Sequence, residues 1–149
     1  MTLEDLDRRL AVLEDERAVI ALVVRSAHAF DDDDEAAFLE CFSDDGAFLT
    51  VAPDGSEVVH GRGTVGLMQF FREFHPIKVV MRHVVATERV HLDGDRAVIA
   101  SYWVVVNADE RRPALMGFGR YIDDCVRTAA CSWRIETRRT TVEGSTLRP

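Results

Sequence analysis

The pattern of apolar and polar positions divides the chain into a helical first part and a strand-rich second part. From Leu3 to Ala27, apolar residues recur mostly every three or four positions, which is the period of an amphipathic helix. The pattern predicts a long helix over residues 3–29, and its first turns are expected to reach a neighbouring subunit. The apolar stripe comprises Leu3, Leu6, Leu10, Leu13, Ile20, Val24 and Ala27.

Shorter elements are expected between residues 35 and 74. Two further helices are predicted, and between them a strand, a Pro-Asp-Gly-Ser turn and a short partner strand form a hairpin. A break at Ser43-Asp44-Asp45-Gly46 separates the first of these helices from the strand. The predicted helices are 35–42 and 64–74, and the predicted strands are 47–51 and 58–60.

The second half of the chain reads as a meander of long strands. Asp93-Gly94 is a strong hairpin signal between the first two strands. Helices followed by antiparallel strands indicate an α+β fold in which three N-terminal helices pack on a curved, mostly antiparallel sheet and form a cone-shaped barrel. We expect one domain over residues 1–149, with about 1–12 and 142–149 peripheral. The predicted long strands are 78–92, 96–107, 115–126 and 132–141.

Charge and composition exclude several functions. The chain has 149 residues, with 18 Lys plus Arg against 26 Asp plus Glu, and a formal net charge of −8. This balance argues against nucleic-acid partners and against docking on anionic membranes. No apolar run approaches the roughly 20 residues that span a bilayer, and no signal peptide is evident, so a cytoplasmic protein is expected. The three cysteines are expected to be free thiols, and no metal-binding or cofactor motif is present.

Several short segments in a consistent order resemble the SnoaL-like group of the nuclear transport factor 2-like superfamily. Relatives in that superfamily include scytalone dehydratase, hexachlorocyclohexane dehydrochlorinase, polyketide cyclases, ketosteroid isomerase and the small subunits of ring-hydroxylating dioxygenases. The resemblance implies a helix-covered curved sheet around a cavity that holds a small molecule. Its segments are 13–20, 27–31, 42–48, 60–62, 82–85, 92–97, 119–121 and 133–135.

The resemblance also implies a catalytic pair. The Asp–His dyad of the dehydratase and the dehydrochlorinase falls on Asp31 and His83. Taken alone, the run of acids at 31–35 favours a solvated loop and helix cap, and His28, three residues before Asp31, is a rival partner for that carboxylate. The register of the resemblance instead favours a buried pair, in which Nδ1–H of His83 bonds to the carboxylate and Nε2 acts as a general base.

Other positions depart from those relatives. The two tyrosines of the dehydratase fall on Phe30 and Thr50, and its second histidine falls near Asn107 or Ala108. The lysine of the dehydrochlorinase falls near Ser26. These departures argue against either of those two particular reactions.

The cavity wall is predicted from strand and helix parity. Core packing explains each apolar candidate by itself, but together they favour a hydrophobic, polyketide-like or aromatic-like ligand. Only one of the adjacent Tyr102 and Trp103 can face inward. The apolar candidates are Phe30, Phe48, Met68, Phe71, Met81, Tyr102 or Trp103, and Met116 or Phe118, and the polar candidates are Tyr102, Asn107, Arg120 and Tyr121. The histidines expected at the surface or in loops are His60, His75 and His91.

Two functions therefore remain open from the sequence. The first is a cofactor-independent lyase, isomerase or cyclase that abstracts a proton from a small hydrophobic substrate. The second is a non-catalytic ligand-binding or structural subunit that resembles the dioxygenase small subunits. A homo-oligomer is expected, and the sequence does not choose between a dimer and a trimer.

Overall fold

The helices and strands follow one another in the predicted order. The computed structural model describes residues 1–74, 80–109 and 112–146. The first residues of the strand predicted from Lys78, and His75, lie outside the described residues. The helices are α1 (Leu3–Asp31), α2 (Glu35–Glu40) and α3 (Gly63–Phe74), and the strands are β1 (Phe42–Val51), β2 (Glu57–Arg62), β3 (Val80–Asp93), β4 (Arg96–Asp109), β5 (Arg112–Arg127) and β6 (Trp133–Ser145).

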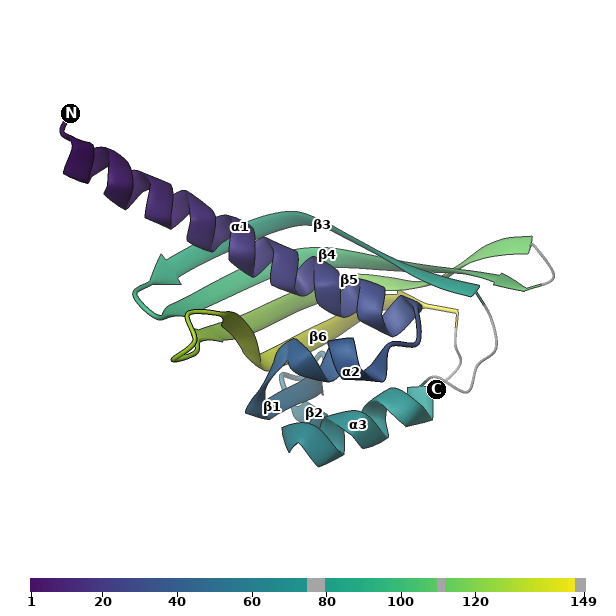
Figure 1. Cartoon of the computed structure of the whole chain (residues 1–149). Helices are drawn as coiled ribbons and strands as arrows, with labels where there is room; N and C mark the ends of the chain where they lie inside the picture. Colours follow the sequence, from purple (N-terminus) through teal and green to yellow (C-terminus); the bar gives the residue numbers. More distant parts are fainter. Residues whose placement is uncertain (75–79, 110–111, 147–149) are drawn as a thin grey trace.

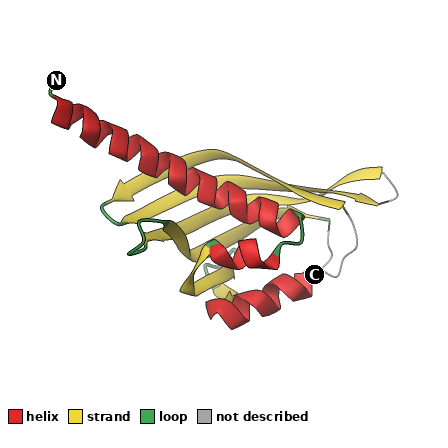
Figure 2. Ribbon diagram, viewed as in Figure 1, coloured by secondary structure: helices red, strands yellow, loops and turns green. Residues whose placement is uncertain are grey.

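All six strands belong to one sheet in the order β2-β1-β6-β5-β4-β3. The β1–β6 pair is parallel and the other pairs are antiparallel. The three helices lie on one side of this curved sheet (Figures 1 and 2). The α+β class and the mostly antiparallel sheet are therefore confirmed. Among the described residues, no helix is both long and apolar enough to cross a bilayer.

The boundary between α2 and β1 differs from the prediction. The helix ends at Glu40, and Phe42 already belongs to β1. The predicted break at residues 43–46 lies inside this strand, where the pairing with β6 shifts register between Phe42 and Ala47. The polar residues therefore mark an irregularity within a strand, since Ser, Asp and Gly also occur at bulges.

The long helix carries two apolar stripes rather than one. Thr2 caps it through a capping box with Asp5, in agreement with the predicted start. Its C-terminal half packs on the sheet through residues that are mostly outside the predicted stripe. The buried residues of α1 are Val19, Leu22, Val23, Ser26, Ala27 and Ala29, whereas the exposed leucines are Leu3, Leu6, Leu10 and Leu13.

The reason for this difference is the length of α1 relative to the sheet. Its first turns project past the end of the sheet, so no strand lies beneath them (Figure 1). Asp15 joins the helix to the strands, because its carboxylate accepts hydrogen bonds from Arg127 and from the indole N–H of Trp133. Sequence periodicity indicates a helix but does not indicate what covers it.

Two strand irregularities set which side chains face the helices. Thr87 has a φ of 59° and interrupts the pairing of β3 with β4. In β5, Met116 is the extra residue between Leu115 and Gly117, which pair with neighbouring residues of β4. A bulge of this kind reverses the alternation of side chains along a strand. Met116 and Gly117 consequently both reach the inner side of the sheet.

Candidate functional site

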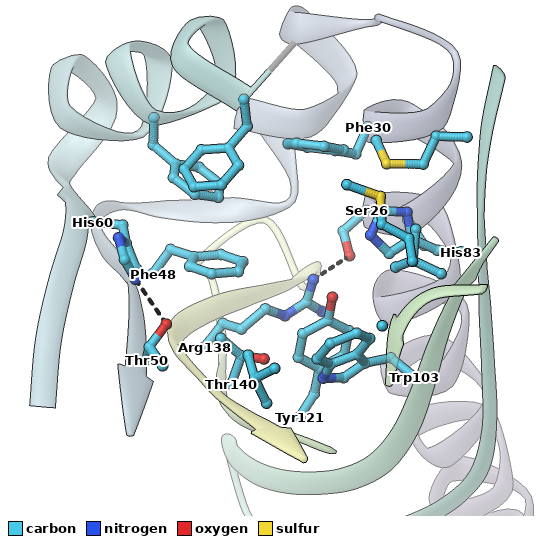
Figure 3. Close-up of a pocket in the computed structure, with 18 of the residues that line it drawn as sticks. Ser26, Phe30, Phe48, Thr50, His60, His83, Trp103, Tyr121, Arg138 and Thr140 are labelled. Carbon is cyan, nitrogen blue, oxygen red and sulfur yellow. Dashed lines mark hydrogen bonds between the residues drawn. The ribbon is translucent and has the colours of Figure 1, made fainter. Parts of the chain in front are cut away.

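A cavity of about 270 Å³ lies between the helices and the inner face of the sheet (Figure 3). This volume is just below the range of about 300–1,000 Å³ found for pockets that hold drug-sized ligands, so the cavity suits a small, compact molecule. Its wall is mostly aromatic and aliphatic, with a small number of polar side chains. The phenylalanines in the wall are Phe30, Phe38, Phe48, Phe70 and Phe74.

Asp31 and His83 meet at one side of this cavity. Asp31 is the last residue of α1, and His83 faces it from β3. The Nδ1 atom of His83 lies 2.6 Å from Oδ1 of Asp31, and the backbone N–H of His83 donates to Oδ2 at 2.7 Å. The Asp31 side chain is 4% exposed and that of His83 is 12% exposed. The imidazole lines the cavity, and the carboxylate lies behind it.

This contact determines which ring nitrogen can accept a proton. An ionised carboxylate is only an acceptor, so Nδ1 of a neutral His83 must carry its hydrogen toward Asp31. The lone pair of the neutral ring is then on Nε2, which is the atom that can act as a base. The helix dipole disfavours a negative charge at the C-terminal end of α1, where Asp31 lies. The two hydrogen bonds from His83 offset this unfavourable interaction. The ring of Phe30 packs edge-on against the imidazole, with centroids 5.7 Å apart.

A buried ion pair contributes a second polar side chain to the wall, that of Arg138. Arg138 on β6 donates from Nε and Nη2 to the Asp123 carboxylate at 2.8 and 2.7 Å, and from Nη1 to Oγ of Ser26 at 2.9 Å. Asp123 is 0% exposed and Arg138 is 3% exposed. Burial opposes the charge of Arg138, but attraction by Asp123 outweighs it and raises the pKa of the guanidinium. A permanent positive charge therefore borders an otherwise apolar cavity.

Tyr121 on β5 lies beside this cation. Its ring packs under the guanidinium of Arg138, with the carbon of that group 4.4 Å from the ring centroid, and stacks on Trp103. Burial raises the pKa of Tyr121 to about 12. The phenol is therefore neutral at physiological pH. Figure 3 shows its hydroxyl near Arg138 and Ser26.

A second histidine lies on the other side of the cavity from His83 (Figure 3). Nε2 of His60 lies 2.7 Å from Oγ1 of Thr50, and both residues belong to the wall. His60 also packs against Phe74, with ring centroids 6.2 Å apart. His60 is exposed, as expected, but its position in the wall was not anticipated.

The structure brings some of the predicted wall residues together and separates others. Five apolar candidates line the cavity: Phe30, Phe48, Met81, Trp103 and Met116. Of the polar candidates, Tyr121 lines it too.

Three of the candidate side chains lie on the outer face of the sheet instead of in the cavity wall. Tyr102 is 46% exposed and Phe118 is 41% exposed. Arg120 lies beside Tyr102 there and forms an ion pair with Glu143. Alternation along β4 turns Trp103 inward and therefore Tyr102 outward. The bulge at Met116 has the same effect on Phe118.

Three further candidates lie outside the wall of the cavity. Phe71 is buried in the core behind Phe30, at a ring-centroid distance of 5.2 Å. Met68 is half-buried on α3, and Asn107 is half-buried on β4 opposite Met81. None of these three side chains contributes to the wall as the structure describes it.

The sequence reasoning missed Asp123 and Arg138, and it considered Ser26 only as the position near which the lysine of the dehydrochlorinase falls. A signal for Asp123 was present, because it alternates with Tyr121 and Cys125 on the inward side of β5. A charged residue at that parity indicates a buried pair. No comparable signal marks its partner, since Arg138 lies among several other arginines and threonines in β6.

Similarity to solved structures identifies the fold of the protein. An NTF2-like protein with a cystatin-like fold from Novosphingobium aromaticivorans superposes with a TM-score of 0.83, at 21% identity over 97% of this chain and 93% of that chain. ActVI-ORFA from Streptomyces coelicolor gives a TM-score of 0.72, at 21% identity over 86% and 96% of the two chains. The protein therefore has the nuclear transport factor 2-like fold.

The family follows from a direct match. The chain belongs to the SnoaL-like domain family, whose profile matches residues 11–139. The beta subunit assigned to an aromatic-ring-hydroxylating dioxygenase of Novosphingobium aromaticivorans is also similar in structure, with a TM-score of 0.77 at 16% identity over 93% and 94% of the two chains. A comparison with curated proteins found no match. The resemblance inferred from the sequence is confirmed.

Proposed function

We propose that the protein is a cofactor-independent enzyme that removes a proton from a carbon atom next to a carbonyl group in a small hydrophobic molecule. His83 is the general base and Asp31 orients it. The single observation that carries the proposal is the 2.6 Å contact between Nδ1 of His83 and Asp31 in the wall of a small apolar cavity. Elimination of water, isomerisation and ring closure all begin with this step.

The charges around the cavity support that reaction. When Nε2 of His83 takes the proton, the ring becomes positive, and the adjacent Asp31 carboxylate stabilises it. The substrate then carries a negative charge on its carbonyl oxygen, and stabilising this oxyanion requires hydrogen-bond donors. A guanidinium has five N–H groups, and three of those on Arg138 bond to Asp123 and Ser26. Arg138 thus retains donor capacity for a ligand oxygen.

The apolar wall supports the substrate class. A ligand oxygen beside Arg138 and a carbon atom beside His83 would leave the rest of the molecule among Phe30, Phe48 and Trp103. Aromatic and aliphatic carbon fits such a surface, whereas sugars and phosphates do not. We therefore expect aromatic or polyketide-like carbonyl compounds as substrates.

Proton exchange tests this proposal without knowledge of the final product. A panel of small aromatic and cyclic ketones is incubated with the protein in D₂O, and deuterium at the carbon next to the carbonyl is measured by mass spectrometry. We expect catalysed exchange that falls by about 10²–10⁴-fold in His83→Ala. His91→Ala is the matched control, since His91 is an exposed histidine of the same strand. Exchange that survives in His83→Ala would exclude the proposed base.

A second function is a ligand-binding or structural subunit without catalysis. The observation that favours it is the likeness to the dioxygenase beta subunit, together with Phe30 and Thr50 at the positions that match tyrosines of the dehydratase. Calorimetric titration with the same ketones separates the two functions. Binding without deuterium exchange, or a stable association with a different protein chain, would favour the second function over the first.

A further inference from the structure

The N-terminal half of α1 presents a row of leucines that its own chain leaves uncovered. Leu3 is 79% exposed, Leu6 44%, Leu10 54% and Leu13 61%. A single exposed leucine is ordinary, but a contiguous row on one side of a helix marks an interaction surface. We name these four residues the leucine row.

The leucine row points away from the domain to which it belongs. At about 100° per residue along an α-helix, its centre lies roughly half a turn from the stripe around Val19, Leu22 and Ser26 that packs on the sheet. The projecting turns in Figure 1 therefore cannot bury the row by bending toward the sheet. A helix end of this length also gains little stability in water without packing.

The spacing of the leucine row is that of a coiled-coil seam. The intervals of three, four and three residues place the leucines at successive a and d positions of two heptads. Such a seam is complementary to an identical seam. We propose that the leucine row pairs with that of a second copy of this chain, as a short parallel coiled coil with the two domains on opposite sides.

The charges beside the row favour this parallel arrangement. With Leu3 at a, Arg9 occupies a g position, and Asp7 and Glu14 occupy e positions. A parallel pair places Arg9 of each copy beside Glu14 of the other, which is attractive. An antiparallel pair places g beside g and e beside e, so that Arg9 would face Arg9 and Asp7 would face an acid.

The seam also has a defined end. The next a position holds Arg17, which is exposed and charged, and from Val19 onward α1 packs on its own sheet. Two identical arginines facing each other stop the pairing at this point. The contact is therefore limited to the projecting turns, and it leaves the cavity of each copy unobstructed.

Sedimentation equilibrium over a concentration series tests the pairing. We expect the 149-residue chain to approach twice its mass of 16.8 kDa. In Leu6→Glu/Leu10→Glu, which loses four buried leucines per dimer, we expect association to weaken by at least about 100-fold. The matched control is Ala11→Glu/Ala18→Glu, which adds the same charge at exposed positions of α1 outside the row and is expected to dimerise normally.

Charge exchange tests the direction of the pair. Arg9→Glu and Glu14→Arg should each weaken the dimer, and the double variant should restore it, because only a parallel pair joins these two positions. Circular dichroism confirms that each variant is folded. A monomeric wild-type protein would overturn the proposal. A dimer that persists in Leu6→Glu/Leu10→Glu would also overturn it and would place the interface elsewhere, such as the exposed outer face of the sheet around Val84 and Ile122.

Discussion

Removal of the Asp123 carboxylate should destabilise the protein strongly, because Asp123 is the buried counter-charge of Arg138. In Asp123→Asn the side chain keeps its volume, but the guanidinium of Arg138 loses its counter-charge while it stays 3% exposed. The amide of asparagine can accept one of the two hydrogen bonds now made at 2.8 and 2.7 Å, and its NH₂ group faces the other donor. Ser26 remains the only other described hydrogen-bond partner of the cation.

The expected magnitude follows from this geometry. Breaking a buried ion pair by removing one partner costs about 3–5 kcal/mol. The remaining acceptor of asparagine puts Asp123→Asn at the lower end, about 3 kcal/mol. For a chain of this size, each kcal/mol lowers the melting temperature by about 2–4 °C, which gives a decrease of about 6–12 °C. Urea unfolding and calorimetry measure both quantities.

Two further variants serve as controls for this prediction. Glu136→Gln removes the acid of the exposed pair with Arg96 and should leave the free energy of unfolding unchanged within error. Asp123→Leu/Arg138→Met replaces both buried charges with apolar groups and should recover most of the lost stability. A loss below about 1 kcal/mol in Asp123→Asn would refute the reasoning, because it would mean that the cation does not depend on Asp123.

Two other predictions concern the backbone and the response to acid. Gly119→Ala should disrupt the β5–β6 pairing, because a Cβ at this position would lie 1.9 Å from the carbonyl oxygen of Thr141. The nearest atom to a Cβ at Gly117 lies at 3.0 Å. Melting curves should therefore show a much smaller decrease in melting temperature for Gly117→Ala than for Gly119→Ala. The hydrogen bond from Arg127 lowers the pKa of Asp15 below its ordinary value of 3.8. The stabilisation by Asp15 is therefore complete above that value and is lost as the pH falls through the lowered pKa. Asp15→Asn should flatten this part of a plot of melting temperature against pH, and an unchanged slope would contradict the assignment.

The sequence predicted the order of elements well because local signals mark their ends. A hairpin turn joins β3 and β4 as expected, although its two residues are Gly94 and Asp95, because Asp93 still pairs with Arg96. Thr2 caps α1, which begins at Leu3. Which side of α1 packs on the sheet was not predictable in the same way. Periodicity reports that one side of a helix is apolar, and it does not distinguish a side that packs on the same chain from one that awaits a partner.

The candidate site was predicted unevenly for a related reason. The contact between Asp31 and His83 came from the register of a family resemblance, since the residues alone favoured a solvated acidic loop. Alternation along the strand placed Trp103 and Tyr102 on opposite faces of the sheet, but it did not show which of the two faces the cavity. The bulge at Met116 leaves no clear mark in the sequence, and it decides whether Met116 or Phe118 reaches the cavity.

The buried ion pair of Arg138 and Asp123 connects stability with function. Replacing a buried ion pair by apolar residues of similar size often leaves a protein equally stable. Stability is therefore a weak reason for a cation in an apolar cavity, and ligand binding is a stronger one. The variant Asp123→Leu/Arg138→Met separates the two reasons. If it folds as well as the wild type but no longer catalyses deuterium exchange, the charge serves the ligand. If it retains exchange, stabilisation of the carbonyl oxygen must come from another donor in the wall, such as the neutral hydroxyl of Tyr121, which Figure 3 shows near Arg138.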